Sequence, residues 1–114
     1  MAEISKDLIR GHTDAIVLNI LAQGDSYGYR IVQDIRSMSD NQYELNEATL
    51  YTVFRRLQKD ELVTPYYGDE TQGGRRKYYA ITDRGHEVLR TAQADWQIAK
   101  PIIDHLVSGK VVEA

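Results

Sequence analysis

The sequence predicts a mainly α-helical domain that carries one small β-hairpin and ends in a long helix. Three observations support this fold class. Apolar residues recur at helical spacing along the first half of the chain, a glycine-rich turn separates two strand-like runs, and apolar residues recur at heptad spacing near the C-terminus. A length of 114 residues leaves room for one domain with a modest core.

The first two helices are predicted over about residues 6–22 and 27–38. The later part of the first helix is apolar nearly all round, so we expect it to be buried. Gly24–Ser26 is expected to end this helix and to supply the N-cap of the next one. The second helix has apolar residues on one face at i, i+4 and i+7, namely Ile31, Ile35 and Met38.

The third helix is the best specified element. Asn46 is a good N-cap, and Glu47 in the first turn suits the helix dipole. One apolar stripe is formed by Leu50, Val53, Phe54 and Leu57. The remaining positions carry hydroxyls, guanidinium groups and an ammonium, which suit phosphates and base edges of DNA: Thr49, Tyr51, Thr52, Arg55, Arg56 and Lys59. An ordinary polar surface helix would explain these residues equally well.

A β-hairpin is predicted from residues 62–67 and 75–81, and Pro65 favours an edge strand. Glycines and cations gather at its tip and on its return strand: Gly73, Gly74, Arg75, Arg76 and Lys77. Because glycine adds no side-chain bulk, such a tip can approach a phosphate backbone closely. A surface hairpin protected by its charges is the alternative.

The order of these elements is that of a winged helix-turn-helix, with a helix for the major groove and a wing for the flanking backbone. We therefore expect a DNA-binding domain over residues 1–81, a dimerisation helix over 82–109 and a tail over 110–114. The net charge of −3 opposes DNA binding, because many DNA-binding domains are basic. However, residues 49–82 carry +2 and the rest carries −5, so positive charge gathers in the predicted interface.

The last helix is expected to begin after the N-cap Thr82. Apolar residues form a heptad seam along it: Leu89, Ala92, Trp96, Ala99, Ile103 and Leu106. Its length of about 40 Å outruns so small a domain. The seam is best buried against a second copy, which predicts a symmetric homodimer on a palindromic operator. Pro101 should either bend this helix or break it.

Trp96 is the only tryptophan, and its neighbours on the seam, Ala92 and Ala99, are small. In a two-fold dimer, two facing Trp96 rings would leave space in which planar aromatic or cationic molecules could stack. Simple packing of Trp96 against the partner subunit is the alternative.

Other function classes receive little support. The histidines, His12, His86 and His105, lack metal-ligand spacing, and no nucleophile–base grouping or phosphate loop is present, so no enzyme, metal or cofactor is expected. The N-terminal segment is not a signal peptide, and no apolar run is long enough for a membrane span. The absence of cysteine is compatible with a cytoplasmic location.

Three motifs resemble the PadR family of bacterial transcriptional regulators. They are SYGYRI at residues 26–31, ATLYTVFRRL at 48–57 and GGRRKYYAITDRG at 73–85. The length and the single C-terminal helix resemble the short subgroup of this family, which includes multidrug-responsive repressors. The resemblance implies a homodimer with a flat hydrophobic channel between its subunits, where a tryptophan pair holds planar drugs and binding alters affinity for operator DNA.

The resemblance also implies that the first helix helps to line this channel. The candidate ligand-binding residues are Trp96, Leu8, Gly11, His12, Ala15, Asn19, Ala92, Asp95 and Ala99. Lys100 and Pro101 depart from the subgroup's pattern and leave the ligand class open. A regulator that senses phenolic compounds and a winged-helix dimer that acts through protein–protein contacts remain alternatives.

Overall fold

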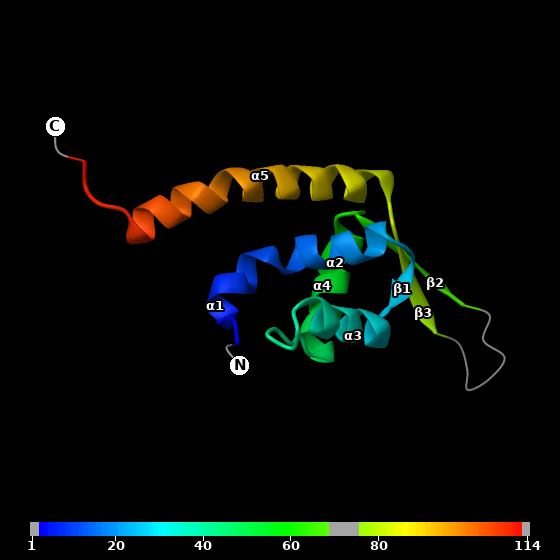
Figure 1. Cartoon of the computed structure of the whole chain (residues 1–114). Coiled ribbons are helices and arrows are strands. Elements are labelled where there is room, and N and C mark those ends of the chain that lie inside the picture. Colours follow the sequence, from blue (N-terminus) through cyan, green and yellow to red (C-terminus); the bar gives the residue numbers. More distant parts are fainter. Residues whose placement is uncertain (1–2, 69–75, 113–114) are drawn as a thin grey trace.

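A computed structural model of the chain describes residues 3–68 and 76–112 and shows helices packed around a small sheet, with one long helix lying across the top (Figure 1). The elements are α1 (Lys6–Ile9), the 3-10 turn η1 (Arg10–His12), α2 (Thr13–Ala22), β1 (Ser26–Tyr27), α3 (Gly28–Met38), α4 (Glu47–Lys59), β2 (Val63–Tyr67), β3 (Lys77–Ile81) and α5 (Asp83–Ser108). The predicted fold class, mainly α with a small β structure, is confirmed.

The predicted first helix is divided into α1, η1 and α2. The tighter turn η1 contains Gly11, and glycine is a poor residue for the interior of an α-helix. The apolar second half is buried as predicted, because Val17, Leu18 and Leu21 are at most 1% exposed. This half forms the centre of the core.

Strand β1 is a finding that the sequence did not predict. Ser26 pairs with Tyr79 and Tyr27 with Tyr78, so the antiparallel sheet has the order β1-β3-β2. The prediction that Gly24–Ser26 caps the next helix was wrong. The N-cap of α3 is Tyr27, which makes no side-chain cap bond, because strand pairing already fixes Ser26 in extended, buried backbone.

Helix α4 and the hairpin agree with their predictions. The Asn46 side chain accepts a hydrogen bond from the Thr49 amide at 2.8 Å, which confirms the cap. Strand β2 lies at an edge of the sheet and contains Pro65. The Phe54 ring stacks on Tyr79 with 3.8 Å between centroids, so the buried stripe of α4 packs against the central strand β3.

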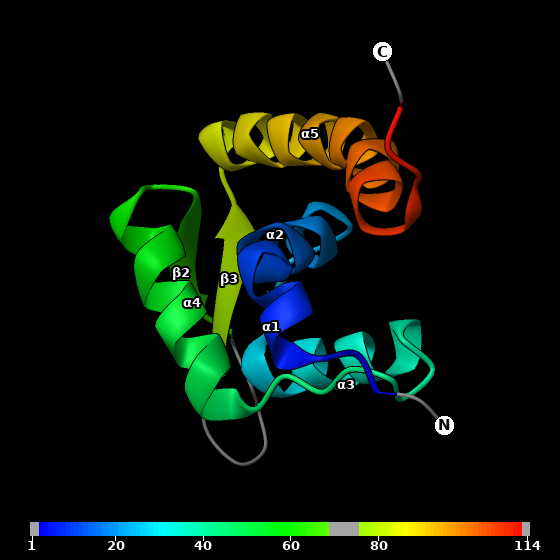
Figure 2. The ribbon, with the colours of Figure 1, turned by 90° about the vertical axis from the view of Figure 1, so that its left-hand side faces the viewer.

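Helix α5 begins at the predicted cap, where the Thr82 hydroxyl accepts from the Gly85 amide at 3.0 Å. It is continuous through Pro101, so of the two expected outcomes the break does not occur. Figures 1 and 2 show its axis changing direction in the orange part that contains Pro101, as an interior proline predicts.

Only Gly85 and Leu89 of α5 are buried. Leu89 was predicted to lie in the dimer seam, but it is 5% exposed and belongs to the core of its own chain. The first turns of α5 still lie over the domain, where the chain itself can cover an apolar side chain. The predicted seam therefore begins after Leu89.

Candidate nucleic-acid interface

The predicted DNA-binding residues of α4 lie on one exposed face of the helix. Thr49, Thr52, Arg55 and Lys59 are all exposed, while the opposite stripe is buried. The Thr52 hydroxyl donates to the Ala48 carbonyl at 3.2 Å, and Arg55 donates to the Thr52 hydroxyl at 3.3 Å. The face thus presents hydroxyl and guanidinium groups that are already arranged side by side.

Arg56 differs from the other cations of α4 because it has a partner within the chain. Its Nε donates to Asp14 Oδ2 at 3.1 Å, and its second nitrogen pairs with the other carboxylate oxygen. This hydrogen bond to Asp14 raises the pKa of the Arg56 guanidinium above its ordinary value. The charge of Arg56 is therefore partly compensated by Asp14 of α2, and its role as a DNA contact stays a prediction.

A hollow of about 280 Å³ lies where the first turns of α3 and α4 meet strand β3. Arg76 donates to the Tyr27 hydroxyl at 3.1 Å, and its guanidinium carbon lies 4.6 Å from the centre of that ring. Lys77 Nζ lies 5.6 Å from the Tyr79 ring centre. The lining residues are Tyr27, Gly28, Tyr29, Glu47, Tyr51, Arg76, Lys77 and Tyr79. The hollow thus combines phenol groups, two cations and the Glu47 carboxylate beside the first turns of α3 and α4.

A row of aromatic rings supports the base of the hairpin. The Tyr78 ring lies 5.3 Å from Tyr27 and 5.6 Å from Tyr66, so the row crosses all three strands. The Tyr66 hydroxyl donates to Asp25 Oδ2 at 2.7 Å, and this bond raises the pKa of Tyr66. Arg76 and Lys77 are thereby held on a stiff base. The predicted tip residues Gly73, Gly74 and Arg75 lie outside the described residues.

Two of the predicted ligand residues, Trp96 and His12, are in contact with each other. Their ring centroids are 4.8 Å apart in an edge-to-face arrangement. Trp96 is still 42% exposed, and Lys100 Nζ lies 6.0 Å from its ring centre. Of the other predicted ligand residues, Ala15, Asn19, Ala92 and Ala99 are half-buried, whereas Leu8, Gly11 and Asp95 are exposed.

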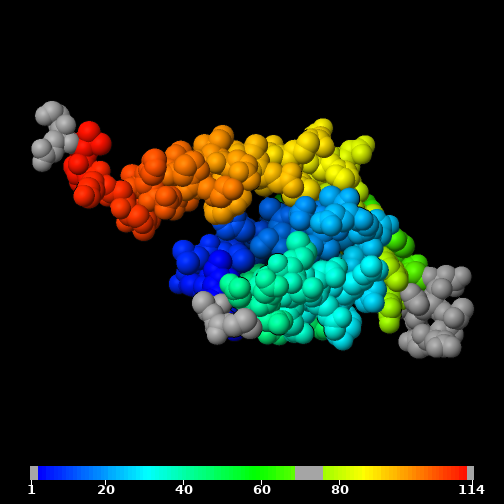
Figure 3. All heavy atoms as spheres, in the orientation of Figure 1, coloured from blue at the N-terminus to red at the C-terminus, as the bar shows by residue number. Residues whose placement is uncertain are grey.

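The distal half of α5 exposes a large apolar surface, and Figure 3 shows its orange-to-red part extending beyond the body of the molecule. Ile103 is 51% exposed and Leu106 is 80% exposed, and both belong to the predicted seam. Neighbouring turns add Ile98, Ile102 and Val107. Large exposed apolar surfaces are uncommon on monomeric proteins and often belong to interaction sites.

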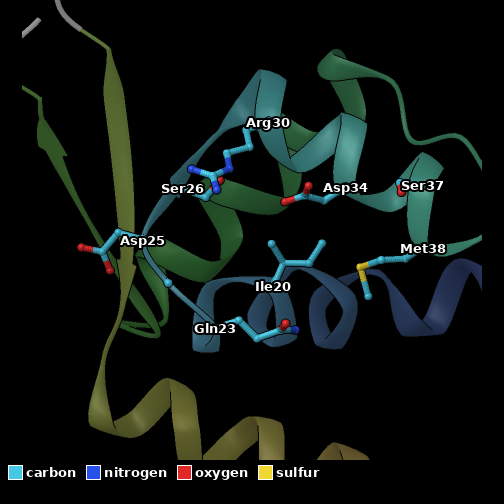
Figure 4. Close-up of a pocket in the computed structure, with 9 residues that line it drawn as sticks. Ile20, Gln23, Asp25, Ser26, Arg30, Asp34, Ser37 and Met38 are labelled. Atoms are coloured by element: carbon cyan, nitrogen blue, oxygen red, sulfur yellow. The ribbon is translucent and has the colours of Figure 1, made fainter.

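Sequence reasoning missed a second hollow, of about 360 Å³, between the end of α2 and α3. Figure 4 shows Ile20 and Asp34 approaching each other across it, with Arg30 and Met38 on the same helix as Asp34. The Ser26 hydroxyl is buried beside it without a hydrogen-bond partner among the described residues. No local motif marks this hollow, because its residues come together only when α2 packs on α3.

Within residues 3–68 and 76–112, no cluster of three or more histidine, aspartate or glutamate side chains is arranged to hold a metal ion. No helix in the same part of the chain has the length and apolar character that crossing a bilayer requires.

Comparisons with known proteins point to one family. Residues 17–91 match the transcriptional regulator PadR-like family. An uncharacterised protein X of Lysinibacillus sphaericus is 44% identical over 106 residues, which span 93% of this chain and 97% of that protein. The transcriptional regulator YqjI of Escherichia coli (strain K12) is 29% identical over 79 residues, which span 69% of this chain and 36% of that protein.

Solved structures agree with this match. A transcriptional regulator from Clostridium thermocellum has a TM-score of 0.83 and 42% identity, with 90% of this chain and 99% of that chain covered. A PadR family transcription regulator from Clostridium difficile R20291 has a TM-score of 0.75 and 31% identity, with 85% and 99% covered. The matches with a described role are transcriptional regulators rather than enzymes. The chain therefore belongs to the PadR-like family of transcriptional regulators.

Proposed function

We propose that the chain is a cytoplasmic, ligand-responsive repressor that binds a palindromic operator as a homodimer. Residues 1–81 would form the DNA-binding unit, and residues 82–109 would form the dimerisation helix. The observation that carries the proposal is the exposed polar face of α4 beside a hollow that holds Arg76 and Lys77. This arrangement offers base-edge contacts and phosphate contacts on adjoining surfaces.

In this proposal α4 enters the major groove. Thr49, Thr52 and Arg55 read base edges, because their hydroxyl and guanidinium groups are exposed on one face. Phosphates approach the hollow beside the first turn of α3, where backbone amides and nearby cations favour anions. The phosphate contacts are assigned to Tyr51, Lys59, Arg76 and Lys77, and to the hairpin tip with Gly73, Gly74 and Arg75.

The partner needed for a palindrome is a second copy of the chain, paired along α5. The predicted seam after Leu89 supports this pairing, because Trp96, Ile103 and Leu106 are exposed while Ala92 and Ala99 are half-buried. Two copies related by a two-fold axis would place their α4 helices on half-sites about 34–36 Å apart. The dimer contact also brings two Trp96 rings near the axis.

The ligand is proposed to lie between those rings, as in LmrR-like multidrug-responsive repressors. Trp96 supports this assignment because it is half-exposed and held at one edge by His12. A planar inducer would alter DNA affinity only to the extent that it binds one dimer arrangement better than another. A tenfold change in DNA affinity requires a difference of about 1.4 kcal/mol, which is within reach of one aromatic stacking contact.

A second candidate is a regulator that senses phenolic compounds. The observation in its favour is Lys100, whose ammonium already lies 6.0 Å from the Trp96 ring centre. A cation at this position repels a cationic dye and attracts a phenolate or a carboxylate. The two candidates differ in ligand charge and share the same site.

The ligand proposal is tested by titrating Trp96 fluorescence, which is specific because the chain has one tryptophan. A planar cationic dye and a planar phenolic acid are titrated separately, and each sample is assayed for binding to the DNA upstream of the protein's own gene. Quenching with changed DNA affinity supports a ligand-gated regulator, and the more effective probe decides between the candidates. Quenching with unchanged DNA affinity refutes gating, and absence of quenching refutes the site.

The DNA interface is tested with the double variant Arg76→Ala, Lys77→Ala. Removing two phosphate contacts should weaken DNA binding and reduce the slope of log affinity against log salt concentration by about 2. Arg84→Ala with Arg90→Ala is the matched control, because it removes the same charge from exposed positions on α5. If the hairpin variant and the α5 control change the salt slope equally, Arg76 and Lys77 do not make specific phosphate contacts. Insensitivity of all binding to salt would favour a dimer that acts through protein contacts.

A further inference from the structure

The first turn of α2 contacts two different functional surfaces. His12, the N-cap of this helix, lies edge-to-face against Trp96 with 4.8 Å between ring centroids. Asp14, two residues later, binds Arg56 of α4 through both carboxylate oxygens. One helical turn thus joins the proposed ligand platform on α5 to the proposed DNA-reading helix.

The geometry of the Asp14–Arg56 pair suits a positioning role. Two parallel hydrogen bonds between a carboxylate and a guanidinium fix direction as well as distance. The pair is formed between residues 42 positions apart, so it constrains α4 relative to α2 rather than within one helix. Its side chains are 42% and 46% exposed, so it is accessible to substitution without opening the core.

Other ion pairs in the described part of the chain do not share these features. The pair of Arg10 with Asp7 is local, at a spacing of three residues. The pair of Arg84 with Glu61 is 3.9 Å long and more exposed, at 65% and 81%. The pair of Arg36 with Glu44 joins α3 to the loop between α3 and α4, and neither residue belongs to α4. Among the described ion pairs, only Asp14–Arg56 includes a residue of α4, the helix proposed to read DNA.

We propose that Asp14 is a positioning residue: through Arg56 it sets the orientation of α4, and it transmits movement at the His12–Trp96 contact to the DNA-reading face. This inference rests on the proposed function, because it assigns the reading of DNA to α4. It gives Arg56 a role different from direct DNA contact. Asp14 itself would touch neither DNA nor ligand.

Arg56 either positions α4 through Asp14 or contacts DNA directly. Asp14→Asn separates these two roles, because it weakens DNA binding in the first case and tightens it in the second. If Asp14 positions α4, Asp14→Asn weakens binding to the specific operator by about tenfold, while binding to unrelated DNA is unchanged. Arg56→Gln gives a similar loss, and the double variant is no worse than either single one because both break the same contact. Arg56→Lys restores only part of the specific affinity, because an ammonium lacks the paired geometry.

If Arg56 contacts phosphate directly, Asp14→Asn releases it and tightens binding to both DNAs, with a salt slope steeper by about 1. That result overturns the positioning role, as does an unchanged ratio of specific to non-specific affinity. Glu61→Gln is the matched control, because it removes a carboxylate from the longer pair beside the end of α4. It should leave the ratio unchanged.

A second measurement needs no DNA. Hydrogen exchange of the α4 amides and the emission maximum of Trp96 are compared in wild type, Asp14→Asn, Arg56→Gln and Glu61→Gln. Faster exchange and altered emission in the first two variants alone support the link between the two surfaces. The absence of both changes overturns it. If the wild type bound the DNA upstream of its own gene no more tightly than unrelated DNA, the proposed function would be refuted instead. Failure of the positioning role and failure of the proposed function are therefore distinguishable.

Discussion

Helices α4 and α5 carry similar apolar spacings, yet their apolar faces meet different environments. On α4, Leu50, Phe54 and Leu57 are at most 1% exposed. On α5, Trp96 is 42% exposed and Leu106 is 80% exposed. Apolar spacing therefore identifies the face that will be buried, but it does not say which chain buries it.

The difference follows from where each helix lies. Helix α4 packs against α3, α2 and strand β2, and Phe54 stacks on the central strand β3. Helix α5 starts over the domain, where Gly85 and Leu89 are covered, and then runs past it (Figure 1). The same pattern thus stabilises the fold in one helix and leaves an exposed apolar face in the other, which we propose pairs with another copy.

Phe54→Ala should cause the largest effect, because it removes a fully buried ring that stacks on Tyr79 at 3.8 Å. We expect the free energy of unfolding to fall by about 3–5 kcal/mol in urea denaturation. Tyr51→Ala is the control, since it truncates a half-exposed aromatic residue of the same helix. It should cost about 1 kcal/mol or less. Similar losses of unfolding free energy in the two variants would show that the buried stripe of α4 does not stabilise the core more than its exposed face does.

Ile103→Glu should act on association and leave the fold intact. The side chain is 51% exposed in the single chain, so a charge there costs little until a partner covers it. We expect the dimer to weaken by about 2 kcal/mol, or about thirtyfold, in sedimentation at micromolar protein. Val111→Glu is the control, because that residue is 91% exposed beyond the end of α5. Equal association constants for wild type and Ile103→Glu would exclude this seam from the dimer.

Much of the fold was predictable because its signals are local. The caps Asn46 and Thr82, the buried stripe of α4 and the two strands of the hairpin depend on residues a few positions apart, and all of them are present. Strand β1 was missed because two residues are too few to show an alternation of apolar and polar side chains. In addition, its partner strand β3 lies about half of the chain length away in sequence. Leu89 was misassigned because spacing cannot tell a core contact from a partner contact.

The candidate site was predictable only in part, for the same reason. Exposure of Thr49, Thr52 and Arg55 follows from helix geometry once the apolar stripe is known. His12 and Trp96 were both named as candidate ligand residues through the family resemblance, but their contact with each other was not predicted. The Asp14–Arg56 pair and the hollow around Arg76 depend on the packing of elements distant in sequence. No spacing rule brings those residues together.

The three-stranded sheet provides the smallest and most specific test. Tyr66 donates to Asp25, and this hydrogen bond raises the pKa of Tyr66 in the folded protein. A raised folded-state pKa means that the bond stabilises the fold fully below the unfolded pKa of about 10. The stabilisation is lost as pH rises through the higher folded value, because the unfolded chain then holds fewer protons than the folded one.

Tyr66→Phe removes this dependence without removing the ring that stacks on Tyr78 at 5.6 Å. The urea midpoint of the wild type should exceed that of the variant below about pH 10, and the two should converge as the pH rises above this value. The difference between the two proteins isolates Tyr66, because the other tyrosines and the lysines titrate in both. Curves that stay parallel over this range would mean that the Tyr66–Asp25 bond contributes nothing to stability. Convergence would show that the bond between Tyr66 of β2 and Asp25 of the loop before β1 stabilises the fold.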